Sequence, residues 1–173
     1  GPLKMKDTYF KLPEFKKERF CSIYGTMLKL KESYKLTEFL NDRMESGGGG
    51  LVSTSSDYLK FCSLMLNEGI YNSDTLISPF LIEEMTKNQL PSGEGVYKID
   101  EEVAIGFGLG FSINLQELGQ YGHKGDFGWS GIGGTHFVIS PNENLVVIIM
   151  TQKQPFSTKI KDELISIIYQ EIE

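Results

Sequence analysis

The stretch Phe127-Gly128-Trp129-Ser130-Gly131-Ile132-Gly133-Gly134-Thr135-His136-Phe137-Val138 decides the fold of this chain. Its pattern predicts a strand, a glycine-rich turn and a second strand. Glycine inside a strand usually marks a place where another backbone or a ligand comes close. We therefore expect a hairpin here that something approaches closely.

The bulk composition is typical of one globular domain. The chain has 173 residues, of which 40% are hydrophobic and 23% are charged, and this length is enough for one ordinary core. Its formal charge of −6 at pH 7 argues against a nucleic acid or an anionic membrane as a partner. The longest apolar run, Leu145–Met150, is too short to span a bilayer. We expect a soluble protein, and the composition does not indicate its compartment.

Residues that hold metals and form disulfides are sparse. Cys21 and Cys62 are the two cysteines, and two isolated thiols make neither a disulfide framework nor a metal cluster. Cys62 falls in a helical pattern, where it fits a small core residue. His123 and His136 are the two histidines, so a histidine-rich metal site is excluded, whereas a carboxylate-rich one is not. We expect no metal and no other cofactor.

The chain divides into three parts. Residues 1–50 form an irregular part that ends in the glycine run 47–50. This run fits either a flexible linker or a tight backbone passage, and we favour the passage because helix-capping residues follow it at once. Residues 51–104 form a helical part, and residues 105–173 carry strands and a last helix.

Helical spacing of apolar residues predicts two helices in the middle part. The first begins among Ser53–Ser56, whose side chains can cap it, and ends near Asn67. The second begins at Ser78, because the proline after it suits the first helical position. Residues 91–104 are typical of an exposed loop.

Strand periodicity predicts an antiparallel sheet in the last part. The expected strands are Phe107–Leu115, Gly122–Ser130, Thr135–Ser140 and a buried central strand, Leu145–Thr151. Ser157 caps a final helix. We expect the packed stripe of that helix to consist of Ile160, Leu164, Ile167, Ile168 and Ile172. The predicted fold is α+β, an antiparallel sheet covered by a C-terminal helix, with a small helical region beside it.

Several segments resemble, in order, the motifs of one family. Met5–Thr8 is similar to its Leu-Gly-Met-Lys-Asp-Thr stretch, and Gly48–Asp57 to its Gly-Gly-Gly-Leu-Val-Ser-Thr-x-x-Asp segment. Gly106–Phe111 resembles its Gly-x-Gly-Leu-Gly-Phe strand, and Phe127–Thr135 holds a Trp-x-Gly core. The family is that of the β-lactamase-related serine hydrolases, which includes class C β-lactamases, penicillin-binding peptidases and family VIII carboxylesterases. The resemblance implies a sandwich of the β-lactamase/transpeptidase-like type, here incomplete.

The resemblance also implies acyl-serine chemistry. In such enzymes the serine of a Ser-x-x-Lys pair attacks an ester or amide carbonyl, and the lysine, often with the tyrosine of a Tyr-x-Asn element, handles the proton. A third element lies on a strand that faces the serine, and the residue after its glycine gives a backbone N–H to the oxyanion hole. Carried onto this chain, Trp129 and Gly131 belong to the third element and Ile132 supplies the N–H. Ser130 and Gly133 then lie on the substrate side.

Some assignments stay open. His123-Lys124-Gly125 is a rival for the third element, although the spacing to Pro141 favours Trp129-Ser130-Gly131. Ser130 fits either a substrate contact or a filler of the strand face. His136 is expected to face solvent or to make a local hydrogen bond. The resemblance implies cleavage of esters or of β-lactam-like or D-Ala-peptide-like amides, and the Trp-x-Gly form of the element favours small esters over β-lactams.

The first two elements are missing from the sequence. No serine is followed by lysine at the third position, and no tyrosine by asparagine at the second. In the family both elements precede the stretch that Met5–Thr8 resembles. We therefore expect the chain to be the C-terminal segment of a longer serine hydrolase and to be inactive alone. The alternative is a non-catalytic binding or assembly module that keeps the fold.

The same resemblance predicts a partner. In the family, N-terminal strands join the sheet and each end of the chain gives a covering helix. Without that N-terminal part, strand Leu145–Thr151 should have an unpaired edge, and such edges recruit other chains. We expect a homo-oligomer formed through this edge.

Overall fold

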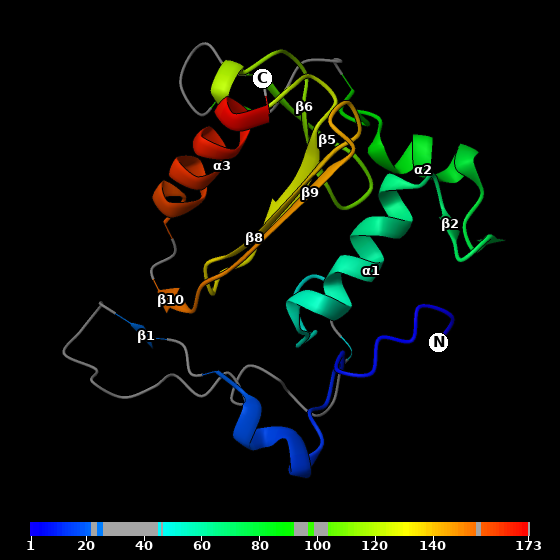
Figure 1. Ribbon diagram of the computed structural model, residues 1–173, viewed down its shortest axis with the longest axis vertical. Coiled ribbons are helices and arrows are strands. Elements are labelled where there is room, and N and C mark those ends of the chain that lie inside the picture. The colour runs from blue at the N-terminus through cyan, green and yellow to red at the C-terminus, as the bar shows by residue number, and fades with distance from the viewer. Residues whose placement is uncertain are drawn as a thin grey trace.

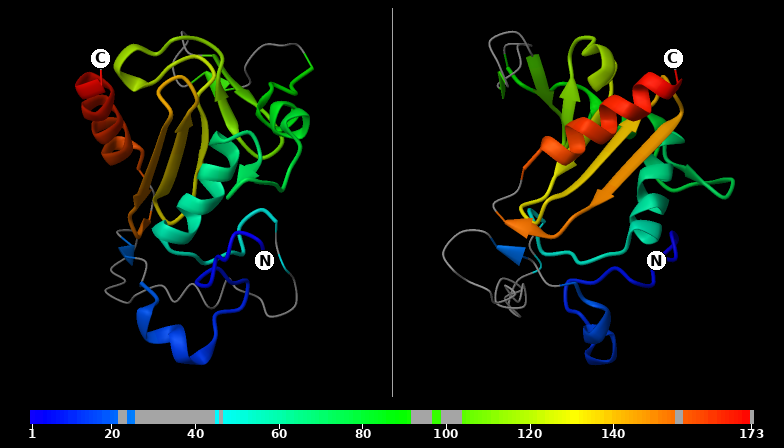
Figure 2. Two further views of the ribbon diagram at one scale, coloured as in Figure 1. Left: turned by 45° about the vertical axis from the view of Figure 1, so that its right-hand side comes forward. Right: turned by 60° about the vertical axis from the view of Figure 1, so that its left-hand side comes forward.

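The computed structural model describes residues 1–21, 24–25, 45, 47–91, 97–98, 104–154 and 157–172. In this part an antiparallel sheet of six strands has helix α3 on one face and helix α1, with α2 beside it, on the other (Figures 1 and 2). The N-terminal segment lies next to the start of α1. The predicted class, α+β with a C-terminal covering helix, is confirmed.

The strands of the sheet follow one another in chain order, each antiparallel to the next. They are β4 (Tyr97–Lys98), β5 (Ala104–Phe107), β6 (Ser112–Asn114), β7 (Phe127–Ser130), β8 (Thr135–Ser140) and β9 (Leu145–Met150). Two small pairs lie outside the sheet. They are the parallel pair β1 (Tyr24–Gly25) with β10 (Lys153–Gln154), and the antiparallel pair β2 (Ile70–Tyr71) with β3 (Asp74–Thr75).

The α-helices of the described part begin close to the predicted starts, whereas its 3-10 helices were not predicted. The α-helices are α1 (Ser55–Leu66), α2 (Pro79–Thr86) and α3 (Lys159–Ile172), and the 3-10 helices are η1 (Glu14–Arg19) and η3 (Gly119–Tyr121). The side chain of Thr54 accepts from the amide of Asp57, and that of Ser78 from the amide of Leu81, so α1 and α2 have capped starts. Within the described ranges, every helix is too short or too polar to cross a membrane.

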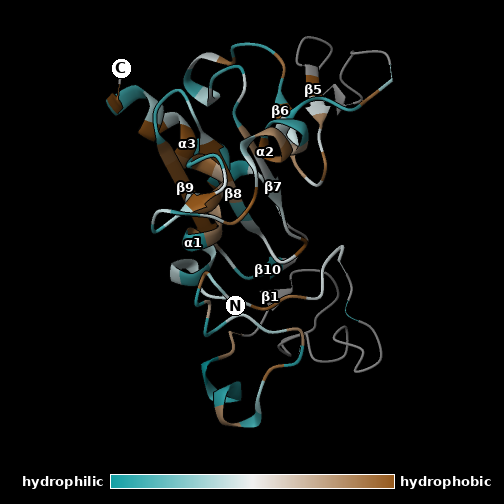
Figure 3. Cartoon of the chain, turned by 90° about the vertical axis from the view of Figure 1, so that its right-hand side faces the viewer, coloured by the Kyte–Doolittle hydropathy of each residue, from teal (hydrophilic) through white to brown (hydrophobic). Residues whose placement is uncertain are grey.

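Two hydrophobic clusters fill the layers on either side of the sheet. The cluster under α1 and α2 consists of Cys62, Met65, Ile82, Phe111, Ile113, Phe127 and Ile139. The cluster under α3 consists of Val147, Ile165 and Tyr169. In Figure 3 hydrophobic residues, drawn in brown, lie along β9 and in parts of β8 and α3. Because strand side chains alternate between faces, β8 and β9 contribute to both layers.

The segment that decides the fold forms the predicted strand, turn and strand. β7 pairs with β8 from Phe127 opposite Ile139 to Ser130 opposite His136. A side-chain carbon at Gly128 would collide with the carbonyl oxygen of Phe137, so the close neighbour is a backbone. In the turn, Gly134 has a φ of 85°, a left-handed conformation that glycine adopts without strain.

A buried carboxylate joins two of the sequence motifs. Asp57, at the start of α1, is 4% exposed and accepts from the amide of Asp7 at 2.6 Å and from the ammonium of Lys60 at 2.6 Å. Burial alone would raise the pKa of Asp57, but the Lys60 and Asp7 hydrogen bonds outweigh it and hold that pKa below its ordinary value. Tyr9 bridges to Val52 beside this contact. The segments Met5–Thr8 and Gly48–Asp57 are therefore one structural unit.

A second buried carboxylate anchors α3. Asp126 is 2% exposed and accepts from the hydroxyl of Tyr169 at 2.6 Å and from the amide of His123 at 2.8 Å. The ring of His123 lies between Glu117 at 3.1 Å and Glu143 at 3.2 Å. The hydrogen bond to Glu117 raises the pKa of His123. The end of α3 is thus tied to the loop that precedes β7.

Four expectations about the backbone are wrong. Residues 107–115 are not one strand, because β5 ends at Phe107 and the chain turns before β6. Residues 122–126 are a loop, since Asp126 must turn inward to reach Tyr169. Residues 97–98 are a strand within the expected loop, the rest of which lies mostly outside the described residues. Nothing lies within 4 Å of a side-chain carbon built at Gly47 or at Gly49, so these glycines do not form a tight passage.

The position of β9 was also mispredicted. The sequence indicated a central strand, but in the described part β9 pairs with β8 alone and forms one edge of the sheet. Its apolar composition comes from the two layers, because α1 covers one face and α3 the other. β9 has no second neighbour among the described strands, and the oligomer expected through the edge of Leu145–Thr151 stays a prediction.

The packed stripe of α3 differs from the expected one. Four members of that stripe are exposed, namely Ile160 (47%), Leu164 (40%), Ile167 (57%) and Ile172 (44%). Ile165 and Tyr169 face the sheet instead. The hydroxyl of Tyr169 has to reach Asp126, and this bond turns the Ile165 side of the helix toward the sheet.

We predict that Gly128→Ala lowers the free energy of unfolding by about 2–4 kcal/mol, because the new methyl group would push β8 away from β7. Chemical denaturation monitored by circular dichroism measures this loss. The matched control is Gly49→Ala, where the methyl group enters open space and we expect a change within about 0.5 kcal/mol. Equal losses in the two variants would contradict the prediction.

Candidate active site

The strand β7 carries its last two side chains to opposite faces of the sheet. Trp129 lies on the face of α1, together with Phe127, and Ser130 lies on the face of α3. The Trp129 side chain is 50% exposed, so it is not a core residue. The hydroxyl of Ser130 is 2.8 Å from Nδ1 of His136, its cross-strand neighbour. The structure therefore shows two different environments for these neighbouring residues.

An aromatic pair lies at the end of β7. The ring of Trp129 meets Phe107 of β5 edge to face, with centroids 5.2 Å apart. Trp129 is 50% exposed and Phe107 36%, so the pair presents apolar surface to solvent. Ile132, in the turn after β7, is 69% exposed. Exposed apolar side chains of this kind can form a surface for a ligand or a partner.

The turn after β7 is held by backbone hydrogen bonds. The amide of Gly131 donates to the carbonyl of Thr135 at 2.7 Å, and Gly134 donates to Gly131 at 2.9 Å. The carbonyl of Gly133 accepts from Lys153 at 2.8 Å, which ties the turn to the segment after β9. Within the described part of the chain, the amide of Ile132 donates to no residue. It is a free N–H in an ordered turn.

The five residues expected at the site fall into two groups. Trp129, Gly131, Ile132 and Gly133 belong to the end of β7 and its turn, whereas the Ser130 side chain points to the other face. His136, which the sequence placed in solvent or in a local hydrogen bond, is 3% exposed and makes the hydrogen bond. The contributions of Phe107 and Lys153 were missed, since each depends on a contact between distant segments.

The rival element lies elsewhere. His123, Lys124 and Gly125 belong to the loop before β7, where Gly125 donates to the carbonyl of Asn114. His123 is held by the two glutamates and packs on Tyr169. These residues support the end of α3 and do not lie on a strand next to the turn.

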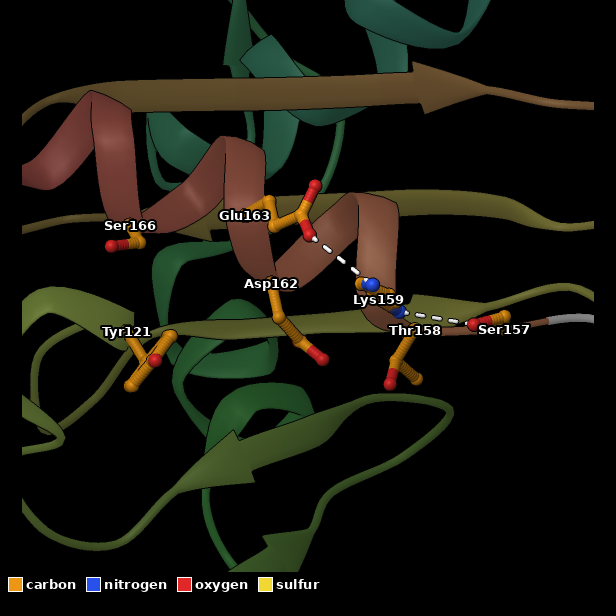
Figure 4. A pocket seen from close by; sticks show the side chains of 7 residues that line it. All are labelled: Tyr121, Ser157, Thr158, Lys159, Asp162, Glu163 and Ser166. Carbon is orange, nitrogen blue, oxygen red and sulfur yellow. Dashed lines mark hydrogen bonds and ion pairs between the residues drawn. The ribbon is translucent and has the colours of Figure 1, made fainter.

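A separate hollow of about 340 Å³ lies between η3 and the start of α3 (Figure 4). Its lining is polar and consists of Tyr121, Ser157, Thr158, Lys159, Asp162, Glu163 and Ser166. Trp129 and Ile132 do not line it, so it is distinct from the surface beside the turn. Among the described residues, no cluster of histidine, cysteine and acidic side chains could hold a metal ion.

Comparison with known proteins identifies relatives of the whole chain. The sequence model of the family described as Beta-lactamase matches residues 1–170. Protein Rv1367c from Mycobacterium tuberculosis (strain ATCC 25618 / H37Rv) is 26% identical over 170 residues, covering 90% of this chain and 41% of that protein.

Two solved structures have a similar fold. The LovD6 mutant of simvastatin synthase from Aspergillus terreus has a TM-score of 0.77 at 21% identity, covering 99% of this chain and 49% of its own. EstCE1, a hydrolase with promiscuous acyltransferase activity, has a TM-score of 0.73 at 18% identity, covering 97% and 48%. These likenesses confirm the β-lactamase/transpeptidase-like fold. The chain spans less than half the length of the proteins that it matches.

Proposed function

The chain belongs to the beta-lactamase family, and on that premise we propose that it forms one wall of the active site of a serine hydrolase. The nucleophilic serine and its lysine would come from a preceding segment of a longer protein. The observation that carries the proposal is the amide of Ile132, which has no partner among the described residues and follows the Trp129-Ser130-Gly131 element, whose Trp129 is exposed.

The amide has a defined role in this reaction. The serine oxygen adds to the carbonyl carbon of an ester or amide, and the electron pair of the C=O bond moves to its oxygen. The Ile132 N–H then donates to that oxyanion. The alcohol or amine leaves with a proton, and water later releases the acid from the acyl-serine. One such donor is worth roughly 3 kcal/mol in the transition state.

The surface beside the amide favours small, neutral esters. The side chains beside the amide are the apolar rings of Trp129 and Phe107. A site for an anionic substrate would be expected to have a cationic side chain in their place. The similar fold of EstCE1, a hydrolase with promiscuous acyltransferase activity, supports acyl transfer from esters. The substrate proposed is therefore an ester with a small apolar acyl group, in preference to a β-lactam or a D-Ala peptide.

The partner of this wall would be the N-terminal part of the same protein. In the described part of the chain β9 is an edge strand, and α3, which packs over it, exposes Ile160, Leu164 and Ile167. An edge strand beside an apolar helix flank offers both backbone hydrogen bonds and hydrophobic area. In the absence of the N-terminal part, a second copy of the chain would occupy this surface.

We predict that the 173-residue chain alone does not hydrolyse p-nitrophenyl acetate, because it has no Ser-x-x-Lys pair. A longer protein that carries this pair upstream should turn the ester over and retain the acyl group on serine, as seen by mass spectrometry. Turnover by the chain alone would refute the proposal. A longer protein without the pair and without turnover would establish the competing function, a non-catalytic binding or assembly module.

In the longer protein, Ile132→Pro should lower kcat by about 100- to 1000-fold, because it removes the N–H that faces the oxyanion. Ile132→Ala keeps that N–H and should change kcat by less than about threefold. Steady-state kinetics with p-nitrophenyl acetate compares the two. Similar losses in both variants would show that the side chain, and not the amide, matters.

The chain alone should form dimers or larger assemblies in light scattering at high protein concentration. Leu164→Lys should weaken that assembly at least about tenfold, because it places a charge on the apolar flank of α3. Leu59→Lys is the matched control, since Leu59 is an exposed leucine of α1 (45%). A monomeric mass for the unsubstituted chain would rule the assembly out.

A further inference from the structure

Ser130 and His136 connect the turn of the candidate site to the C-terminal helix. The Ser130 hydroxyl is 2.8 Å from Nδ1 of His136. Ser130 itself follows Trp129 of the candidate site directly in the sequence. His136 lies on β8 and is 3% exposed, and the backbone of Ser157, which precedes α3, lies close enough to the ring to raise its pKa. Three segments of the chain therefore meet at one buried ring.

The chemistry of the ring suits a contact with a hydroxyl. Burial, aided by the nearby Lys161, lowers the pKa of His136. A neutral imidazole has one donor nitrogen and one acceptor nitrogen. In the tautomer that carries its proton on Nε2, Nδ1 accepts from the Ser130 hydroxyl, and in the other tautomer it donates to that oxygen.

This connection acts on the residue next to the oxyanion turn. Ser130 is the last residue of β7, and the turn that carries the Ile132 amide begins directly after it. An oxyanion donor must be held within about 0.5 Å of its productive position. The backbone bonds of Gly131 and Gly134 shape the turn, while the Ser130 side chain fixes where it leaves the sheet.

We propose that His136 is a positioning residue: through Ser130 and Ser157 it holds the turn that presents the Ile132 amide in register with the start of α3. The effect of His136 on catalysis rests on the proposed function, in which the Ile132 amide donates to the oxyanion. Its structural part, the contact of Ser130 with the buried His136, stands on the geometry alone.

A serine hydrogen-bonded to a neutral histidine also has the composition of a nucleophile and its base. The Ser130 side chain points to the α3 face, whereas the Trp129 side chain points to the α1 face. The geometry therefore favours positioning. Acylation of Ser130 by a serine-reactive fluorophosphonate in the 173-residue chain would overturn the proposal.

The first experiment uses the 173-residue chain. His136→Phe removes the ring nitrogens that face Ser130 and Ser157 and keeps an aromatic ring. Ser130→Ala removes only the hydroxyl that contacts His136. In both variants, amide hydrogen exchange at Gly131 and Gly134 should accelerate at least about tenfold, and the emission of Trp129, the single tryptophan, should shift. His136→Asn places an acceptor near Nδ1 and should restore slow exchange in part. His123→Gln, the control, removes the other histidine and should leave exchange in the turn unchanged.

The second experiment measures ester hydrolysis by the longer protein. His136→Phe and Ser130→Ala should each lower kcat about 10- to 100-fold with KM within about twofold, because misplacement affects the transition state more than binding. The double variant should be no worse than His136→Phe alone, since that single change already removes the contact with Ser130. His136→Asn should recover part of kcat.

The two experiments separate the possible failures. Unchanged exchange in His136→Phe would overturn the tie, whatever the activity. Faster exchange with full kcat would overturn the positioning role. If the unsubstituted longer protein hydrolyses no ester, the proposed function fails, and the exchange result still decides whether His136 holds the turn. If His136→Phe does not fold, Ser130→Ala and His136→Asn provide the same comparison.

Discussion

The close contact of β7 with β8 at Gly128 is the constraint on which the rest of the structure depends. It fixes the register that places Trp129 opposite Phe137 and Ser130 opposite His136. Because side chains alternate along a strand, a slip of one residue would send Trp129 to the α3 face and Ser130 to the α1 face. A glycine at position 128 therefore sets both the aromatic surface and the buried Ser130–His136 contact.

Two buried carboxylates hold the outer elements to this sheet. Asp57 joins the N-terminal segment to α1, and Asp126 joins the loop before β7 to α3. Burying a charge is costly unless it is hydrogen-bonded, so each carboxylate stabilises the fold only when its hydrogen-bond partners are in place. Those partners are distant in sequence. These contacts therefore specify which parts of the chain lie together, a task that apolar side chains perform less selectively.

Local patterns predicted the elements well but not the faces that they bury. Caps at Thr54 and Ser78, and the strand and turn around Trp129, depend on neighbouring residues and were found from the sequence. Helix α3 is apolar on more than one side, so periodicity did not reveal that the Ile165 side packs on the sheet. That choice is made by Tyr169 and Asp126, whose contact no local pattern contains.

The candidate site was predictable from the sequence in its backbone element but not in the contacts between distant segments that support it. The Trp129-Ser130-Gly131 element and the Ile132 amide came from the resemblance, and the structure leaves that amide without a described partner. The role of His136 was not foreseen, because the alternating pattern of its strand does not show on which face of the sheet the histidine side chain lies. Its burial follows from the register at Gly128 and from the position of Ser157.

The order of the strands connects the site to the surface that would receive a partner. β8 separates β7, which carries the site, from β9, which has the free edge. The Ile132 turn is also tied to the segment that follows β9, because the amide of Lys153 donates to the carbonyl of Gly133. His136 of β8 contacts Ser130 at the end of β7, so the buried ring lies between the strand that carries the site and the strand at the edge.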